Sequence, residues 1–244
     1  MLTILKKELQ TYFLGYTAYI AALIFNVVCV LFLWFFDQDY NIFNSGLASL
    51  NSFFFIAPWV LMFLIPALTM RQIAEEQANG TLLWLFTQPI NIRQIILEKY
   101  ASVIILVLFI LLFTLPYLNS LEKLVLPEQN IDYGIIWCGY LGLILLGSLF
   151  AAVGIFASSL TKNQVMAYIL AMFFNFILFF GFQSLASYNL MGSNDYIIQK
   201  TGAFSHYNQF LKGILDTRSL IYFVVVCSLF LIGSMMMVER KKIA

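Results

Sequence analysis

The sequence predicts an all-α protein embedded in a membrane, and three observations support this fold class. Of the 244 residues, 62% are hydrophobic and 10% are charged, whereas about 25% of the residues of an ordinary soluble domain are charged. The mean hydropathy is +0.89. Six long apolar stretches follow one another along the chain. The few charged side chains cannot cover a water-facing surface of normal size, so we expect an integral membrane protein.

Each apolar stretch is long enough to cross a bilayer as a helix, which takes about 20 residues. None contains Asp, Glu, Lys or Arg, and none alternates between apolar and polar residues as barrel strands do. The first stretch exceeds the 7–15 apolar residues of a signal-peptide core, so we expect it to remain in the protein. The predicted spans, within one domain covering residues 1–244, are residues 15–36, 51–70, 100–121, 133–158, 164–186 and 220–238.

The basic residues outside the spans predict the orientation. Nine lie on the side of the N-terminus and four on the other side, and loops rich in Lys and Arg stay in the cytoplasm. We therefore predict that both termini are cytoplasmic. The nine are Lys6, Lys7, Arg71, Arg93, Lys99, Lys162, Arg240, Lys241 and Lys242, and the four are Lys123, Lys200, Lys212 and Arg218.

The first 16 residues have the apolar spacing of an amphipathic helix. We predict that this helix lies along the cytoplasmic surface of the membrane before the chain enters the first span. The predicted apolar stripe consists of Leu2, Leu5, Leu9, Tyr12 and Tyr16.

A polar segment, residues 71–99, separates the second and third spans and surrounds the short apolar run 82–86. We predict that a helix over residues 71–78 ends at a left-handed turn at Asn79-Gly80. Thr81 is then expected to cap a short apolar helix that Pro89 ends. A capping box of Asn91 and Gln94 is expected to start the next helix. The short helix needs a surface to bury it: the lipid interface, the protein's own bundle or a partner's groove.

The stretch EEQANGTLLWLFTQPI (residues 75–90) resembles the signature that follows the second span in ABC-2 type permeases, the membrane halves of many ABC exporters. The resemblance implies that the short helix is a coupling helix that docks on a separate ATP-hydrolysing subunit. Leu83 departs from the family, which usually has an acidic residue there. The docking residues implied by position are Glu75, Glu76, Gly80, Thr81, Leu82, Trp84, Leu85, Thr87 and Pro89.

Two further stretches resemble the same family. KKELQTYFLGYTAYI (residues 6–20) is similar to its N-terminal connecting helix, with Tyr16 where Pro is common. FSHYNQFLKGILDTRSLIYF (residues 204–223) is similar to the segment before its last span. Together the three stretches most resemble the permease of the gliding-motility-associated ABC transporter. The resemblance implies a bacterial inner-membrane exporter, a second permease copy (identical or related) and an accessory membrane protein with an outer domain.

The chain lacks the motifs of several other functions. It contains no GxxxxGK followed by Ser or Thr, so we expect ATP and Mg²⁺ to be bound by the partner ATPase and no cofactor to be bound here. The three cysteines are scattered through the spans, which favours apolar packing over metal binding. The net charge of +1 gives no support to nucleic-acid binding, and membrane lipid is the remaining expected partner.

Catalysis by the chain itself is not expected. His206 lies beside Ser205, but no third partner or nucleophile motif accompanies them. The spans contain no acidic or histidine cluster of a lipid-modifying enzyme, and no charge of an ion relay. We expect an ABC permease subunit, and the alternative is a non-transporting membrane scaffold of a motility or secretion complex.

Small and polar residues inside the spans predict how the helices pack. Asn26 and Asn175 are the strongest polar groups there. We expect hydrogen bonds between helices, and the alternative is a position along a translocation path. The fourth span carries Gly142, Gly147 and Gly154, which allow helix backbones to approach closely. Whether these glycines pack within one chain or against a second copy is not decided by the sequence.

Overall fold

The computed structural model describes residues 3–36, 41, 49–87, 91–123, 132–187 and 199–243. All regular secondary structure in these residues is helical. Six helical segments are long and apolar enough to cross a membrane, which confirms the six predicted spans. These segments are Thr17–Phe35, Asn51–Ala78, Ile92–Glu122, Tyr133–Leu160, Gln164–Ser187 and Thr217–Lys242.

Three of the spans are composite helices, and three are continuous. The composite spans are α2 (Thr17–Val30) with the π-helical turn η1 (Leu31–Phe35), α6 (Ile92–Leu112) with α7 (Pro116–Glu122), and α9 (Gln164–Phe176) with η2 (Ile177–Gly181) and α10 (Phe182–Ser187). The continuous spans are α4 (Asn51–Ala78), α8 (Tyr133–Leu160) and α13 (Thr217–Ile243). Three shorter helices accompany them: α1 (Thr3–Leu14), α5 (Thr81–Thr87) and α12 (Ala203–Leu211).

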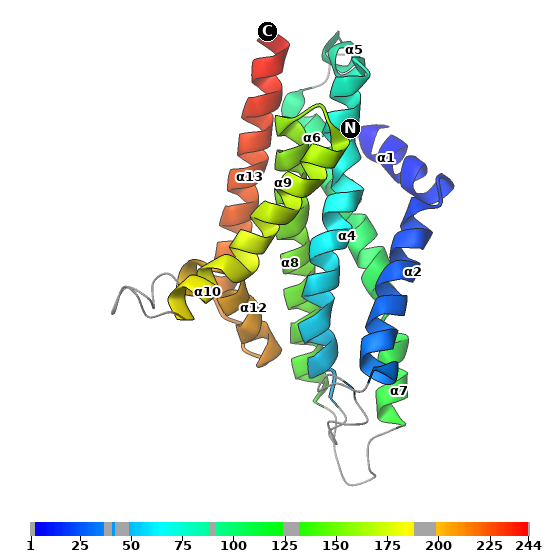
Figure 1. Cartoon of the computed structure of the whole chain (residues 1–244), viewed down its shortest axis with the longest axis vertical. Coiled ribbons are helices and arrows are strands. Elements are labelled where there is room, and N and C mark those ends of the chain that lie inside the picture. The colour runs from blue at the N-terminus through cyan, green and yellow to red at the C-terminus, as the bar shows by residue number, and fades with distance from the viewer. Residues whose placement is uncertain are drawn as a thin grey trace.

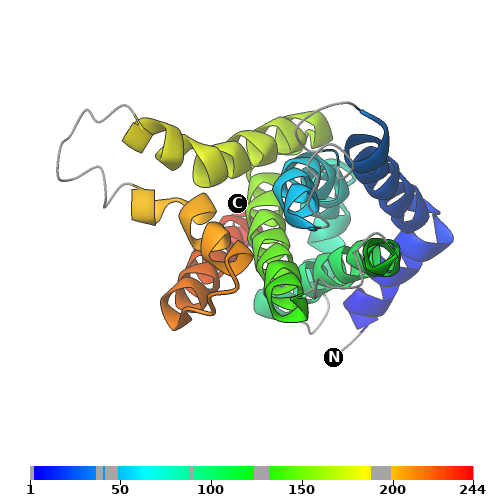
Figure 2. The same cartoon turned by 90° about the horizontal axis from the view of Figure 1, so that it is seen from below.

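Helix α8 lies at the centre of the bundle. Figure 2 shows α4 and α8 in the middle, with α2 and α13 at opposite sides and α9 along one face. The most apolar window of the fourth span is 72% buried, compared with 22% for the fifth and 28% for the sixth. The outer spans therefore present much of their apolar surface to lipid. The C-terminus and α5 lie at one end of the bundle and α7 at the other (Figure 1).

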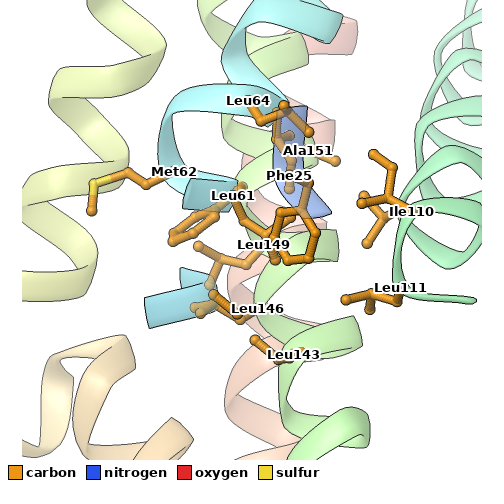
Figure 3. Close-up of a cluster of buried hydrophobic side chains, with 14 of the residues drawn as sticks. Phe25, Leu61, Met62, Leu64, Ile110, Leu111, Leu143, Leu146, Leu149 and Ala151 are labelled. Atoms are coloured by element: carbon orange, nitrogen blue, oxygen red, sulfur yellow. The ribbon is translucent and has the colours of Figure 1, made fainter. Parts of the chain in front are cut away.

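The apolar core fills the space between α2, α4, α6 and α8. Phe25, Leu61, Leu146 and Leu149 are fully buried there, and Figure 3 shows their side chains converging from three of these helices. Ile110 of α6 closes the cluster from the other side. The same core cluster extends to Phe179 of the fifth span and Phe223 of the sixth, so all six spans contribute side chains to it.

The glycines of α8 pack within the chain. A Cβ on Gly142 would lie 2.8 Å from the Cβ of Phe210 in α12, and one on Gly147 would lie 2.9 Å from Val107 of α6. A Cβ on Gly154 would overlap the hydroxyl of Thr69 in α4. The predicted close packing is confirmed, and these glycine faces are used inside the chain.

The two asparagines within the spans behave differently. Asn26 accepts a hydrogen bond from the hydroxyl of Tyr117 on α7 over 3.0 Å, which confirms the predicted bond between helices. Asn175 is fully buried, yet its amide oxygen and nitrogen have no partner among the described residues. The prediction of an interhelical hydrogen bond is therefore wrong for Asn175 within this part of the chain.

We predict that Gly154→Ala destabilises the protein by about 1–3 kcal/mol, because the added methyl group overfills the contact between α4 and α8. Thermal unfolding in detergent measures the effect, and Thr69→Ala in the same chain should restore part of the loss. The control is Gly181→Ala, whose Cβ would meet its nearest neighbour at an ordinary 3.5 Å. Equal unfolding temperatures for the two single variants would contradict the close contact.

Candidate coupling site and its anchors

Helix α4 continues through the polar segment that follows the second span. It ends at Ala78, so the predicted helix over residues 71–78 is its last two turns and not a separate element. Gly80 has a φ of +71°, which confirms the predicted left-handed turn. The hydroxyl of Thr81 donates to the carbonyl of Glu76 over 3.3 Å. The prediction that Thr81 caps the start of α5 is therefore wrong, because its hydroxyl instead satisfies a backbone carbonyl at the end of α4.

The two sides of α5 have different surroundings. Leu82 and Leu85 are buried, and Leu85 forms a small apolar cluster with Ile4 of α1 and Ile95 of α6. Trp84 is 65% exposed. The protein's own bundle therefore anchors one side of the short helix, while the indole of Trp84 extends away from it.

The other candidate docking residues lie around this helix, with one clear exception. Gly80 and Thr87 are exposed, and the Thr87 hydroxyl donates to the carbonyl of Trp84 over 2.7 Å. Glu75 is half-buried at the end of α4. Pro89 lies outside the described residues. Glu76 is the exception, because its carboxylate is directed into the bundle.

Glu76 belongs to a buried ionic network centred on Lys99. The ammonium of Lys99 lies 2.9 Å from Glu76 Oε1 and 2.6 Å from Glu8 Oε1, and the lysine side chain is 1% exposed. It also donates to the carbonyl of Gln72 over 2.7 Å. A buried charge is tolerated when it is paired and hydrogen-bonded, and here the partners come from α1 and α4.

Lys99 does not lie in a loop between the second and third spans, as predicted, but within α6. Helix α6 begins at Ile92, two turns before Lys99, so the lysine is already inside the bundle. The predicted span began one residue after Lys99 because the charge marked its limit. The charge is instead accommodated by carboxylates on neighbouring helices.

Uncharged side chains extend this network across the same three helices. The Tyr12 hydroxyl donates to the carbonyl of Leu68 over 2.9 Å, and Gln72 Nε2 donates to the Tyr12 oxygen over 3.1 Å. Gln72 Nε2 also contacts the hydroxyl of Ser102 on α6 over 3.1 Å. Burial raises the pKa of Tyr12, so this phenol remains a neutral donor.

Glu98, next to Lys99, caps the N-terminus of α1. Its Oε2 accepts hydrogen bonds from the backbone N–H groups of Ile4 and Leu5, each over 3.0 Å. A carboxylate at this position satisfies free N–H groups and complements the positive end of the helix dipole. This role of Glu98 is not predictable from the sequence, because a cap supplied from a distant helix leaves no local pattern.

The amphipathic stripe of α1 differs in part from the prediction. Ile4 and Tyr12 are its buried residues, while Tyr16 is 70% exposed. Tyr16 has a left-handed backbone with φ 59° and lies at the turn between α1 and α2. Leu2 lies outside the described residues. The buried stripe ends at Tyr12, because the left-handed backbone of Tyr16 turns the chain from α1 into α2. The buried residues of the stripe pack against the protein's own helices.

The predicted capping box at the start of α6 is wrong. Asn91 occupies the N-cap position with an extended backbone, but its side chain makes no capping hydrogen bond. The backbone carbonyl of Asn91 instead accepts from the N–H groups of Gln94 and Ile95. The first turn of α6 is therefore closed by the backbone alone.

The contacts of His206 indicate a structural role. The Ser205 hydroxyl donates to the carbonyl of Gly202, so the Ser205–His206 pair does not form. His206 stacks on Tyr222 at 4.2 Å, and its Nε2 lies 2.8 Å from the carbonyl of Lys200. A carbonyl only accepts, so Nε2 carries a proton. No group of side chains suited to a metal ion occurs in the described ranges.

We predict that acid destabilises the protein partly through His206. Burial lowers its pKa below the ordinary 6.5, so the unfolded chain binds the proton more readily than the folded one. Stability is then lost as the pH falls through 6.5 towards the folded pKa. Unfolding temperatures measured from pH 7.5 to 5.5 should fall more steeply for the wild type than for His206→Gln. Parallel curves would contradict this account.

We also predict that Lys99→Met lowers stability by about 3–5 kcal/mol, because it leaves the carboxylates of Glu8 and Glu76 buried without their cation. The matched control is Lys6→Met, whose lysine is exposed on α1. Thermal unfolding in detergent compares the two variants. If Lys99→Met unfolds at the temperature of Lys6→Met, the network does not hold these helices together.

Comparison with known proteins agrees with this architecture. A family model described as "ABC-2 family transporter protein" matches residues 3–234, which include α1, α5 and most of the sixth span. No protein of curated function matches the chain significantly. The chain is therefore a multi-pass membrane protein that belongs to the ABC-2 family of transporter proteins, whose members are non-catalytic permease subunits that generally work with an ABC ATPase.

Proposed function

We propose that the chain is the permease subunit of an ATP-driven exporter and that α5 docks on a separate ATPase. The observation that carries the proposal is the contrast between two neighbouring residues of α5. Leu85 is 8% exposed and Trp84 is 65% exposed. A large exposed aromatic on a helix already anchored to its bundle is typical of a residue that a partner protein covers.

The packing around α5 offers a route from the docking surface into the spans. Leu85 contacts Ile4 and Ile95, so α5 cannot shift without displacing α1 or α6. Lys99 then links α6 to both α1 and α4 through its two carboxylate partners. Closure of ATPase subunits beneath α5 would thereby move three helices together, through contiguous packed contacts.

The remaining assignments follow from this proposal. ATP and Mg²⁺ bind to the partner ATPase, and a second permease copy, identical or related, completes the pathway. Residues 1–244 act as one permease domain in a bacterial inner membrane. The cytoplasmic positions of both termini are supported by eight basic residues against four, leaving out the buried Lys99. The docking surface consists of Glu75, Gly80, Thr81, Trp84, Thr87 and Pro89. Leu82 and Leu85 anchor α5 to the bundle, and Glu76 acts through its pair with Lys99.

A role in gliding motility, with an accessory membrane protein, is supported by the resemblance of residues 6–20, 75–90 and 204–223. In that setting a scaffold that assembles a motility complex is the alternative to transport. Stimulation of the complex's ATPase activity by a translocated substrate supports the exporter. An ATPase rate that no added substrate changes supports the scaffold.

We predict that Trp84→Asp abolishes co-purification of the ATPase without impairing folding, because Trp84 is exposed and unlike Leu85 makes no core contact. The full-length tagged chain is purified from native membranes, and a P-loop ATPase is sought among the proteins retained. Leu85→Asp should instead lower the unfolding temperature, since it places a charge in the cluster with Ile4 and Ile95.

The matched control is Tyr16→Asp, which replaces another exposed aromatic outside α5, at a left-handed position that Asp tolerates. This variant should retain the ATPase. Equal retention by Trp84→Asp and Tyr16→Asp would overturn the docking assignment.

A further inference from the structure

A continuous groove follows one side of α4, bounded by α1 and α2. It comprises a cavity of about 510 Å³ whose wall includes charged and polar side chains, and an apolar cavity of about 750 Å³. The two cavities share Ile24, Leu64 and Ala67 in their walls, so they meet at this level. Helices α2 and α4 lie side by side in both overall views (Figures 1 and 2).

The floor of the groove changes character along a single row of α4 side chains. Residues four apart are neighbours on a helix surface, and one row with this spacing, which winds gradually around α4, lines both cavities. It is aromatic before Ala67 and charged or polar after it. The row consists of Phe55, Trp59, Phe63, Ala67, Arg71, Glu75 and Asn79. The groove thus has an apolar part and a polar end, like an amphiphilic molecule.

The length of the apolar part corresponds to one leaflet of a bilayer. Phe55 and Ala67 are twelve residues apart, which is about 18 Å at 1.5 Å per residue. Half of a hydrocarbon core of about 30 Å is about 15 Å. Arg71 follows Ala67 by one helical turn. A lipid whose chains lie along the apolar part therefore places its headgroup beside Arg71.

The polar end carries charges of both signs without partners. Lys7, Arg71 and Glu75 form no ion pair with any residue that the structure describes. Two acceptor atoms in the same wall, Gln72 Oε1 and Glu76 Oε2, are buried and have no hydrogen-bond partner in these ranges. Gln72 is 4% exposed. Both oxygens are inaccessible from the open groove, so the groups free to bind a ligand at this end are Lys7, Arg71 and Glu75.

We propose that this groove binds one phospholipid whose headgroup carries a phosphate next to a primary ammonium. Arg71 and Lys7 bind the phosphate. The ammonium donates to Glu75, which lines the same end. A headgroup without an ammonium leaves Glu75 without a partner, and a quaternary ammonium has no N–H to donate. Placing the lipid in the cytoplasmic leaflet rests on the proposed orientation, whereas its chemistry does not.

The test uses the full-length chain purified in detergent without any ATPase, so its outcome is independent of the proposed function. Mixed micelles contain equal amounts of phosphatidylethanolamine, phosphatidylcholine and phosphatidylglycerol with identical acyl chains, and native mass spectrometry counts the bound lipids. We expect phosphatidylethanolamine to be retained about tenfold over the other two, from hydrogen bonds between charged groups.

Three variants locate the lipid. Arg71→Gln should reduce retention about tenfold, while the matched control Arg93→Gln, an exposed arginine outside the groove, should not. Glu75→Gln should lower the preference for phosphatidylethanolamine over phosphatidylglycerol. Ala67→Trp fills the junction of the two cavities from an exposed position and should abolish binding. Thermal unfolding of each variant verifies that the fold is retained.

Three results would overturn the proposal. The first is equal retention of the three lipids by the wild type. The second is equal loss of lipid from Arg71→Gln and Arg93→Gln. The third is a lipid-free dimer that Ala67→Trp dissociates, which would mean that a second copy of the chain occupies the groove.

Discussion

The end of the bundle that carries α5 depends on one buried cation. Lys99 is 1% exposed and holds carboxylates from α1 and α4 at 2.6 and 2.9 Å. The gain from such a pair is largely offset by desolvation, so its main effect is on geometry: removing one partner is costly, while the intact arrangement fixes which helices meet. Here it fixes α1, α4 and α6 relative to one another where α4 leads into α5.

Two further contacts make α5 part of this unit. Glu98 holds the first turn of α1, and Leu85 packs between that turn and the start of α6. Helix α4 is used on opposite sides: Thr69 meets Gly154 of α8 in the centre, while Ala67 and Arg71 line the groove beside α2. The same helix therefore connects the core, the groove and α5.

The six spans could be predicted from the sequence, because length and apolar composition suffice to identify a helix in lipid. The turn at Gly80 was predictable for a similar reason, since a left-handed residue favours glycine. The position of Lys99 inside the bundle could not be predicted, because a charge at the end of an apolar run ordinarily marks the limit of the membrane span. The exposure of Trp84 could not be predicted either. Every residue from 82 to 86 is apolar, so no helical periodicity distinguishes the buried side from the exposed side. Glu98 and Glu8 act across about 90 residues, beyond any local pattern.

The central claim is that a separate ATPase covers α5, and photo-crosslinking from position 84 tests it most directly. Trp84 is replaced by a benzophenone amino acid in the full-length protein in native membranes, and the crosslinked product is identified by mass spectrometry. The account predicts a crosslink to a polypeptide that contains a P-loop. A crosslink to lipid or to a second copy of this chain, with the ATPase captured from a different surface, would contradict it.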